Sequence, residues 1–363
     1  MAKFSEVLTI VNGRNQKQVV CDDGKYPIYG SGGIMGYAND YICKAETVVI
    51  GRKGSINKPI FVETPFWNVD TAFGLCANSE KLNPKYLYYF CEKFDFEKLN
   101  TTVTIPSLTK SNLLNVEIPL PNLEKQKQIV ELLDGVMSLI FLRKQQLSKL
   151  DELVKARFVE MFGDCKTNPK NWKTKALEKI ANVGSSKRVF VEELQDSGIP
   201  FYRGTEIGAL AEKKAVIPAL FITEEHYKQL CETTGKPQKG DLLMPSICPD
   251  GRIWIVDTDE PFYFKDGRVL WVHLTSANYN SVFLLYTLKD RIMTDYASIA
   301  SGTTFAELKI FALKKCKIFD VPLELQNQFA NFVERVDQQK QTVQQSLEKL
   351  ELMKKALMQE YFG

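Results

Sequence analysis

An internal repeat at a fixed offset of 200 residues constrains the fold of this chain more than any other feature of its sequence. Both copies end in a Phe-Gly pair, at residues 162–163 and 362–363. Self-similarity at one fixed spacing indicates that the same structural unit is built twice. The matched residues are Thr104 and Thr304, Leu108 and Leu308, Leu113 and Leu313, Ile118 and Ile318, Gln126 and Gln326, Gln128 and Gln328, and Leu147 and Leu347.

Each copy ends in a stretch of about 40 residues with the pattern of one long helix. One face of each stretch repeats at alternating intervals of four and three, which is typical of a left-handed coiled-coil seam. Neither stretch contains proline, and Gly163 and Gly363 are suitable stops. We predict that the two helices bury their seams against each other as an antiparallel coiled coil; the alternative is that each packs on its own domain. The apolar seam residues are Ile129, Leu133, Val136, Ile140, Leu147, Leu150 and Val154 in the first helix, and Phe329, Val333, Val336, Val343, Leu347, Leu350 and Leu357 in the second.

The segments outside the helices differ in sequence but share one character. Both consist of short β-type runs separated by Gly, Pro and Asn turns. A short helix is predicted after Asn83, with Pro84 at its first position, and another over residues 279–296. We therefore expect an α+β fold with a pseudo-two-fold repeat. Its predicted parts are a first module (1–120), a central helix (121–163), a second module (164–320) and a C-terminal helix (321–363), and the predicted strands are 47–50, 59–62, 253–256 and 269–274.

Composition restricts the class of protein. No apolar run approaches the roughly 18 residues that span a bilayer, and the first six residues carry no secretory signal, so we expect a cytoplasmic chain without membrane contact. Eight scattered cysteines form no Cys-x-x-Cys pair, and only two histidines are present, so we expect no metal site. A net charge of +3 is modest for a DNA-binding protein. Any nucleic-acid surface must therefore be a local patch, or a partner must complete it.

Three segments resemble catalytic motifs but lack their context. The glycine-rich run at 30–36 misses the dinucleotide-binding spacing by one position and no helix follows it, so we predict a turn. Asn83-Pro84-Lys85-Tyr86 is similar to an amino-methyltransferase element but fits a helix start better. A carboxylate–lysine set for metal-assisted hydrolysis would have to join residues 249–250 to 307–309, which lie far apart in the sequence.

The remaining interpretation is binding. Two different modules on a repeated frame favour one task performed on two different ligands, such as two unlike DNA half-sites. Glycine lets a backbone approach phosphate, and arginine can bind guanine through two hydrogen bonds. The candidate DNA-binding residues, chosen as cations, hydroxyls and aromatics near glycine-rich loops, are Tyr29, Ser31, Arg52, Lys53 and Lys58 in the first module, and Lys187, Arg188, Tyr202, Arg203, Thr205 and Arg252 in the second.

Over its full length the chain resembles the specificity subunit of a Type I restriction–modification system. The resemblance rests on the two-fold repeat, the helix entries LPNLEKQ (120–126) and VPLELQ (321–326), and the Phe-Gly helix ends. The second entry proline is shifted by one position. The runs YPIYGSGGI (26–34), IGRKGS (50–55) and IPFYRG (199–204) are similar to the family's recognition-domain signatures.

This resemblance implies a non-catalytic subunit that binds double-stranded DNA through two target-recognition domains and reads a bipartite, asymmetric target. It implies two modification subunits that carry S-adenosylmethionine and dock largely on the helices, and restriction subunits that use ATP, with no cofactor in this chain. The alternatives are a stand-alone DNA methyltransferase or nuclease, and a coiled-coil scaffold that never contacts DNA. S-adenosylmethionine binding by the purified chain would favour the methyltransferase.

Overall fold

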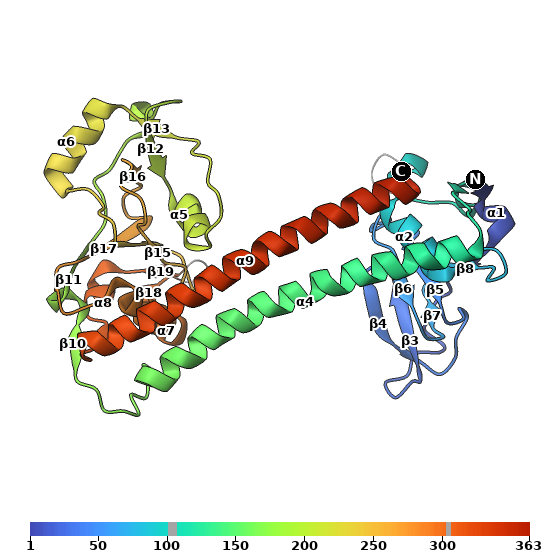
Figure 1. Cartoon of the computed structure of the whole chain (residues 1–363), viewed down its shortest axis with the longest axis horizontal. Coiled ribbons are helices and arrows are strands. Elements are labelled where there is room, and N and C mark those ends of the chain that lie inside the picture. The colour runs from blue at the N-terminus through green and yellow to red at the C-terminus, as the bar shows by residue number, and fades with distance from the viewer. Residues whose placement is uncertain (101–106, 303–305) are drawn as a thin grey trace. The chain divides into compact units, whose positions relative to one another are not determined.

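The computed structural model describes residues 1–100, 107–302 and 306–363 (Figure 1). The chain forms two compact units, one made of Met1–Leu147 with Thr342–Gly363 and the other of Ser148–Gln341. Each unit therefore contains one module together with part of each long helix. Thr104 and Thr304, two positions of the sequence repeat, lie outside the described residues.

The first module is an α+β fold built on a four-stranded antiparallel sheet. Its elements are β1 (Ala2–Lys3), α1 (Phe4–Val7), β2 (Leu8–Asn12), β3 (Tyr26–Gly30), β4 (Gly33–Ala38), β5 (Thr47–Gly51), β6 (Ile60–Val62), β7 (Trp67–Asn68), β8 (Ala72–Ala77), α2 (Pro84–Lys93), η1 (Phe96–Leu99), α3 (Lys110–Leu114) and β9 (Glu117–Ile118). The main sheet has the order β2-β8-β5-β6, a second sheet has the order β4-β3-β7, and β1 pairs with β9. Strand β5 is buried along its whole length, so apolar residues follow one another at 48–50 instead of alternating with polar ones, and the buried Thr47 begins the strand.

The second module repeats this plan. Its elements are β10 (Thr174–Ala176), η2 (Leu177–Lys179), β11 (Ala181–Gly184), η3 (Val191–Glu193), β12 (Ile199–Tyr202), α5 (Gly204–Ala211), β13 (Phe221–Ile222), α6 (Glu224–Thr234), β14 (Leu242–Pro245), β15 (Trp254–Ile255), β16 (Tyr263–Phe264), β17 (Val269–Leu274), α7 (Ser281–Ile299), β18 (Ala300–Ser301), β19 (Glu307–Leu308), α8 (Ile310–Lys314) and β20 (Lys317–Phe319). The sheets have the orders β11-β17-β14-β15 and β13-β12-β16, and β10 pairs with β20.

The two modules thus share one topology although little of their sequence matches. In both, the main sheet links its strands in the same order, and the smaller sheet contains one parallel pair, β3 with β7 or β12 with β16. Helices α5 and α6 are additions to the second module between β12 and β14. The four predicted strands and the helix that begins after Asn83 are confirmed. The turn predicted for the glycine-rich run at 30–36 is limited to residues 31–32, because Gly30 ends β3 and residues 33–36 pair with it as part of β4.

The long helices are α4 (Leu123–Phe162) and α9 (Leu323–Phe362), each 40 residues long and drawn in green and red in Figure 1. Within the first unit the side chains of Arg143 and Ser346 hydrogen-bond at 3.2 Å, whereas Leu133, earlier in α4, shares a core cluster with Met358, later in α9. Residue numbers along the two helices therefore run in opposite directions, so the helices pack antiparallel.

The second unit shows the same antiparallel relation. Asp151 forms an ion pair with Lys340, whereas Phe158, one heptad later in α4, packs its ring 5.5 Å from that of Phe329. The predicted fold class is confirmed: an α+β chain with an internal repeat and two long antiparallel helices.

Most of the predicted seam is buried. Within the first unit Val136, Ile140 and Leu347 form one cluster, against which Leu147, Leu350 and Leu357 pack as partly buried residues. Seam residues near the helix ends also contact the modules: Ile129 lies in the core cluster of the first module, and Phe329 packs on Tyr286 of the second. The helices therefore pack both on each other and on the modules. The buried seam residues are Ile129, Leu133, Val136, Ile140, Leu150, Val154, Phe329, Val333, Val336, Val343 and Leu347.

Each module packs against the beginning of one long helix and the end of the other. The ring of Phe362, at the end of α9, lies 4.9 Å from that of Tyr86 in α2. At the matched place in the second unit, the ring of Phe162, at the end of α4, lies 4.8 Å from that of Phe283 in α7. Figure 1 shows the end of α9 beside α2. The repeated Phe-Gly endings are therefore docking contacts as well as helix stops.

A buried glutamine joins α4 to the first module. Gln126 is fully buried, and its Oε1 accepts a hydrogen bond of 2.8 Å from the backbone N–H of Asn83, the residue that caps α2. Its Nε2 donates to the carbonyl oxygens of Lys81 and Pro121 at 3.0 and 2.8 Å. One side chain thus satisfies three backbone groups where two helices begin.

Gln326 makes the same set of bonds in the second unit. Its Oε1 accepts from the N–H of Asn280, the cap of α7, at 2.9 Å. Its Nε2 donates to the carbonyl oxygens of Asn278 and Val321 at 3.1 and 2.9 Å. This joint explains why a glutamine recurs at an offset of 200 residues.

Substituting Gln126 or Gln326 by alanine should lower the free energy of unfolding by about 2 kcal/mol or more, because one N–H and two carbonyl groups lose their buried partner. Gln128 and Gln328, which are exposed on the same helices, are matched controls whose alanine variants should change stability by less than about 0.5 kcal/mol. Urea unfolding of the four single variants measures the difference. Equal effects at the buried and exposed glutamines would contradict this role.

Candidate nucleic-acid interface

The first module brings Ser31 and the start of the β5–β6 loop together. A Cβ built on Gly51 would lie 3.0 Å from the Cβ of Ser31 and 2.5 Å from the carbonyl oxygen of Ser55. Glycine is therefore required at position 51 for the two loops to approach this closely. Arg52 follows directly, so its exposed side chain and Ser31 belong to adjoining loops.

Arg52 is held by its backbone, and its guanidinium makes no ion pair with the described residues. Its N–H donates to the carbonyl oxygen of Thr71 at 2.8 Å, and its carbonyl accepts from Leu108 at 2.9 Å. The guanidinium carbon lies 5.8 Å from the ring centre of Phe73. Lys53, also exposed, pairs through its backbone with Ser107. The arrangement leaves the polar end of Arg52 available to a ligand.

The other two candidates of this module lie elsewhere. Tyr29 packs edge-on against Phe66, with 5.4 Å between ring centres, as part of a core cluster. Lys58 is exposed and follows Asn57, whose side chain is bonded to Asp95 and to the backbone of Phe96 at η1. The structure therefore groups Ser31, Arg52 and Lys53, and does not group Tyr29 and Lys58 with them.

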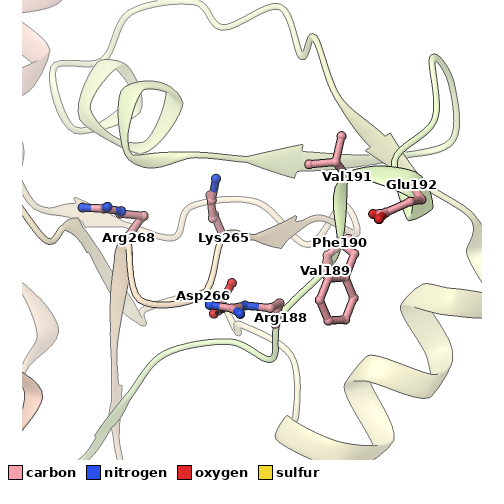
Figure 2. Close-up of a pocket in the computed structure, with 8 residues that line it drawn as sticks. All are labelled: Arg188, Val189, Phe190, Val191, Glu192, Lys265, Asp266 and Arg268. Atoms are coloured by element: carbon pink, nitrogen blue, oxygen red, sulfur yellow. Dashed lines mark ion pairs between the residues drawn. The ribbon is translucent and has the colours of Figure 1, made fainter.

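In the second module, a pocket of about 450 Å³ lies between the segment that follows β11 and the turn that follows β16 (Figure 2). Arg188 is one of the predicted candidates, and its Nε lies 3.4 Å from the Oδ2 of Asp266. Lys265 and Arg268 are exposed cations of the facing turn that the sequence analysis missed. Their signal was the run Lys-Asp-Gly-Arg, in which Gly267 has a positive φ of 64°. The lining residues are Arg188, Val189, Phe190, Val191, Glu192, Lys265, Asp266 and Arg268.

Hydrogen bonds fix the two sides of this pocket to each other. The hydroxyl of Ser185 donates to the carbonyl oxygen of Val269 at 2.6 Å and accepts from the N–H of Gly267 at 2.9 Å. The backbone N–H of Lys187 donates to the hydroxyl of Tyr263 at 3.0 Å. These hydrogen bonds fix the backbone segments that carry the cations, which favours a defined binding geometry.

Arg203 follows the end of β12, beside the same turn. Its guanidinium binds Glu206 through two nitrogens, at 3.2 and 2.6 Å, and the hydroxyl of Thr205 also donates to Glu206, at 2.9 Å. Burial opposes ionisation of Glu206, but these hydrogen bonds outweigh it and lower its pKa to about 2. The pair is therefore ionised at neutral pH. Its stabilisation is fully present above the ordinary carboxyl pKa of 4.5 and is lost as the pH falls from there through about 2.

The remaining candidates of the second module are more constrained. The ring of Tyr202 packs 5.4 Å from that of Phe262, and burial raises the pKa of its hydroxyl. The Nε of Arg252 lies 2.8 Å from Asp250, and its Nη1 lies 4.0 Å from Glu212 at the end of α5. Asp250 and Glu212 therefore both lie close enough to compete with a ligand for the Arg252 guanidinium, as Glu206 does for that of Arg203.

Both modules place their candidate loops at the carboxyl ends of a parallel strand pair. In the second module β12 runs parallel to β16, and the N–H of Lys265 donates to the carbonyl oxygen of Tyr202 at 2.9 Å. Arg203 and Lys265 thus leave the same edge of the smaller sheet. In the first module β3 runs parallel to β7, and Ser31 follows that edge directly. Exposed cations on rigid loops suit phosphate oxygens and base edges.

Other classes of site have no counterpart in the described part of the chain. Across residues 1–100, 107–302 and 306–363, no three His, Cys, Asp or Glu side chains gather where they could hold a metal ion. Within the same ranges, no helix has the length and apolar character needed to cross a membrane.

The chain matches a family model described as the Type I restriction modification DNA specificity domain, over residues 1–152 and again over 169–352. It is 26% identical to a putative type I restriction enzyme specificity subunit of Haemophilus influenzae, over 92% of this chain and 86% of that protein. It is 24% identical to the type I restriction enzyme MjaVIII specificity subunit of Methanocaldococcus jannaschii, over 86% of this chain and 75% of that protein.

Two solved structures share the fold. One is a Type-I restriction-modification system S subunit from M. genitalium, with a TM-score of 0.62 and 16% identity over 100% of this chain and 95% of that one. The other, from work on complex assembly and conformational transition of the type I R-M system, has a TM-score of 0.60 and 17% identity over 99% and 96% of the two chains. With the family model matching both copies of the repeat, the chain belongs to the specificity subunits of Type I restriction–modification systems.

Proposed function

We propose that this chain is the DNA-reading subunit of its complex and that each module recognises one half of a bipartite, asymmetric target. The observation that carries this proposal is the repeated topology with different loops at matched edges. In the first module Ser31 follows β3 of the smaller sheet, and Arg52 follows β5 of the main sheet in the adjoining loop. In the second module Arg203 and Lys265 follow the parallel strands of the smaller sheet, and Arg188 faces Lys265 across the pocket. Equivalent frames with unlike polar side chains suit two half-sites of unlike sequence.

The chain acts as a non-catalytic subunit, and its partners supply the chemistry. Two modification subunits carry S-adenosylmethionine, restriction subunits use ATP, and this chain holds neither cofactor. Support for helix docking comes from α4, which exposes Leu139, Phe141 and Leu142 at 46, 60 and 51%. Such exposed apolar positions on one helix mark a surface that a protein partner can cover. A shared complex also accounts for the modest net charge, since partners contribute phosphate contacts.

The long helices set the distance between the half-sites. Each long helix has 40 residues, and α4 and α9 pack antiparallel within each unit. Forty residues of α-helix extend over about 60 Å, and one turn of B-DNA is about 34 Å. The proposed spacer therefore measures roughly one to one and a half turns of the duplex.

A nuclease footprint of the complex tests the DNA-reading role. The full chain is purified with its modification subunits, and duplexes selected from a random pool are probed in its presence. Two protected segments of unlike sequence with a fixed spacing are expected. A chain that assembles with its partners but leaves every duplex unprotected would be a scaffold, and the proposal would fail.

Arg52→Ala and Arg203→Ala should each relax sequence choice in one half-site only. The guanidinium of Arg52 has no carboxylate partner among the described residues, and Glu206 holds that of Arg203 in a forked geometry that orients its free edge. Losing one arginine–base contact is worth about 1–3 kcal/mol of discrimination. Selection from random duplexes measures the change, and Lys155→Ala, an exposed cation on α4, is the control. If the variants bind all DNA sequences equally more weakly, both arginines contact phosphates instead of bases.

Duplicating one heptad in each helix, residues 141–147 in α4 and 343–349 in α9, should lengthen the preferred spacer by about 3 base pairs. The insertion keeps the seam in register and adds about 10 Å to each helix. Binding to targets with graded spacers measures the shift, and duplication in α4 alone, which breaks the pairing, is the control. An unchanged spacer in the double insertion would exclude the helices as the determinant of spacing.

A further inference from the structure

Two large apolar side chains project into solvent at the rim of the second module's pocket. Phe190 is 57% exposed and Val191 is 82% exposed. They stand where η3 begins, and both line the pocket with Arg188, Lys265 and Arg268. Figure 2 shows the two side chains leaving opposite sides of the ribbon, on the side of the pocket remote from Arg268.

The turn that carries this pair is fixed on both sides. The N–H of Phe190 donates to the Oε2 of Glu193 at 2.7 Å, and the N–H of Glu193 donates back to the carbonyl oxygen of Phe190 at 3.1 Å. Val189 and Leu194, which flank the pair, pack against a core cluster that contains Phe201. Because Val189 and Leu194 are anchored in this way, Phe190 and Val191 are held outward.

The surroundings of the pair contain two cations without an ion pair. Arg188 pairs with Asp266 and Arg268 pairs with Glu307, and Glu192 and Glu193 also lie in this region. Lys187 and Lys265 are exposed and make no ion pair with the described residues. An apolar tip beside such cations complements a DNA duplex, in which apolar bases lie between two rows of phosphates.

The first module also exposes two consecutive apolar residues, but at a different place in its topology. Ile34 and Met35 follow Gly33 in β4 and are 56 and 64% exposed. They come after β3, whereas Phe190 and Val191 come before β12, the counterpart of β3. The pair at Phe190 and Val191 is therefore a feature of the second module.

We propose that Phe190, with Val191 on the other side of the same turn, forms an apolar wedge that enters a groove of the second half-site and contacts the bases, while Lys187 and Lys265 bind neighbouring phosphates. This inference rests on the proposed DNA-reading function and adds base-contacting residues that are not cations. Apolar side chains inserted between base steps are a known means of unstacking a duplex. The wedge makes part of the specificity depend on how easily a base step opens.

The test compares Phe190→Ala and Val191→Ala with Ile217→Ala, another exposed apolar residue of the second module. Each full chain is purified with its modification subunits. Affinity is measured on the selected target and on random duplex, and 2-aminopurine is placed in turn in the two half-sites. The wild-type complex should raise the 2-aminopurine fluorescence at one step of the second half-site, because insertion unstacks it.

Phe190→Ala should bind the selected target about tenfold more weakly, bind random duplex unchanged, and lose the fluorescence rise, whereas Phe190→Trp should retain it. Ile217→Ala should behave as wild type. Equal binding by Phe190→Ala and wild type, or equal losses on both DNAs, would overturn the wedge. Failure of either alanine variant to assemble with the modification subunits would place a protein on this surface instead. If the wild-type complex selects no DNA sequence, the proposed function fails before the wedge is tested.

Discussion

The structure depends on the antiparallel pairing of α4 with α9, because this pairing lets each module be held at two points. The first module is covalently continuous with the start of α4 and packs on the end of α9, whereas the second module is covalently continuous with the end of α4 and the start of α9 and packs on both. Phe362 on Tyr86 and Phe162 on Phe283 are the non-covalent contacts, and Gln126 and Gln326 fix the covalent ones. Burial of aromatic side chains and complete hydrogen bonding of buried polar groups both contribute to these joints. If either helix ended early, one module would lose half of its attachment.

In this structure the buried strands and the candidate binding loops are separate parts of each module. The central strands β5 and β14 are buried along their whole length, and both modules have the same sheet order. The loops that follow the parallel pairs β3–β7 and β12–β16 are not part of these buried strands. They hold Ser31 in one module and Arg203 with Lys265 in the other. A change of target can therefore be made in the loops without disturbing the core or the helices.

The sequence was informative where a pattern is local or long. The 40-residue helices were predictable because a 3–4 alternation sustained over that length is typical of a coiled coil and of few other structures, and the helix after Asn83 because its cap and Pro84 are adjacent. The shared topology was not visible, since strand order depends on pairings between distant segments. Lys265 was missed because it lies 77 residues from Arg188, and only the pairing of β11 with β17 and the hydrogen bonds of Ser185 and Lys187 bring the two segments together. Tyr29 and Tyr202 were chosen as aromatics beside glycine or arginine, but their rings face the core, and local sequence does not encode that orientation.

The most direct measurement is the target selected by a chain with two copies of its first module. Residues 175–318, which begin in β10 and end in β20, would be replaced by residues 2–118, which begin in β1 and end in β9. The complex with the modification subunits is then used to select duplexes from a random pool. If two equivalent modules on a pseudo-two-fold frame each read one half-site, the selected target is an inverted repeat of the first half-site. Recovery of the original asymmetric target would contradict the account, because the second half would then be read by something other than the second module.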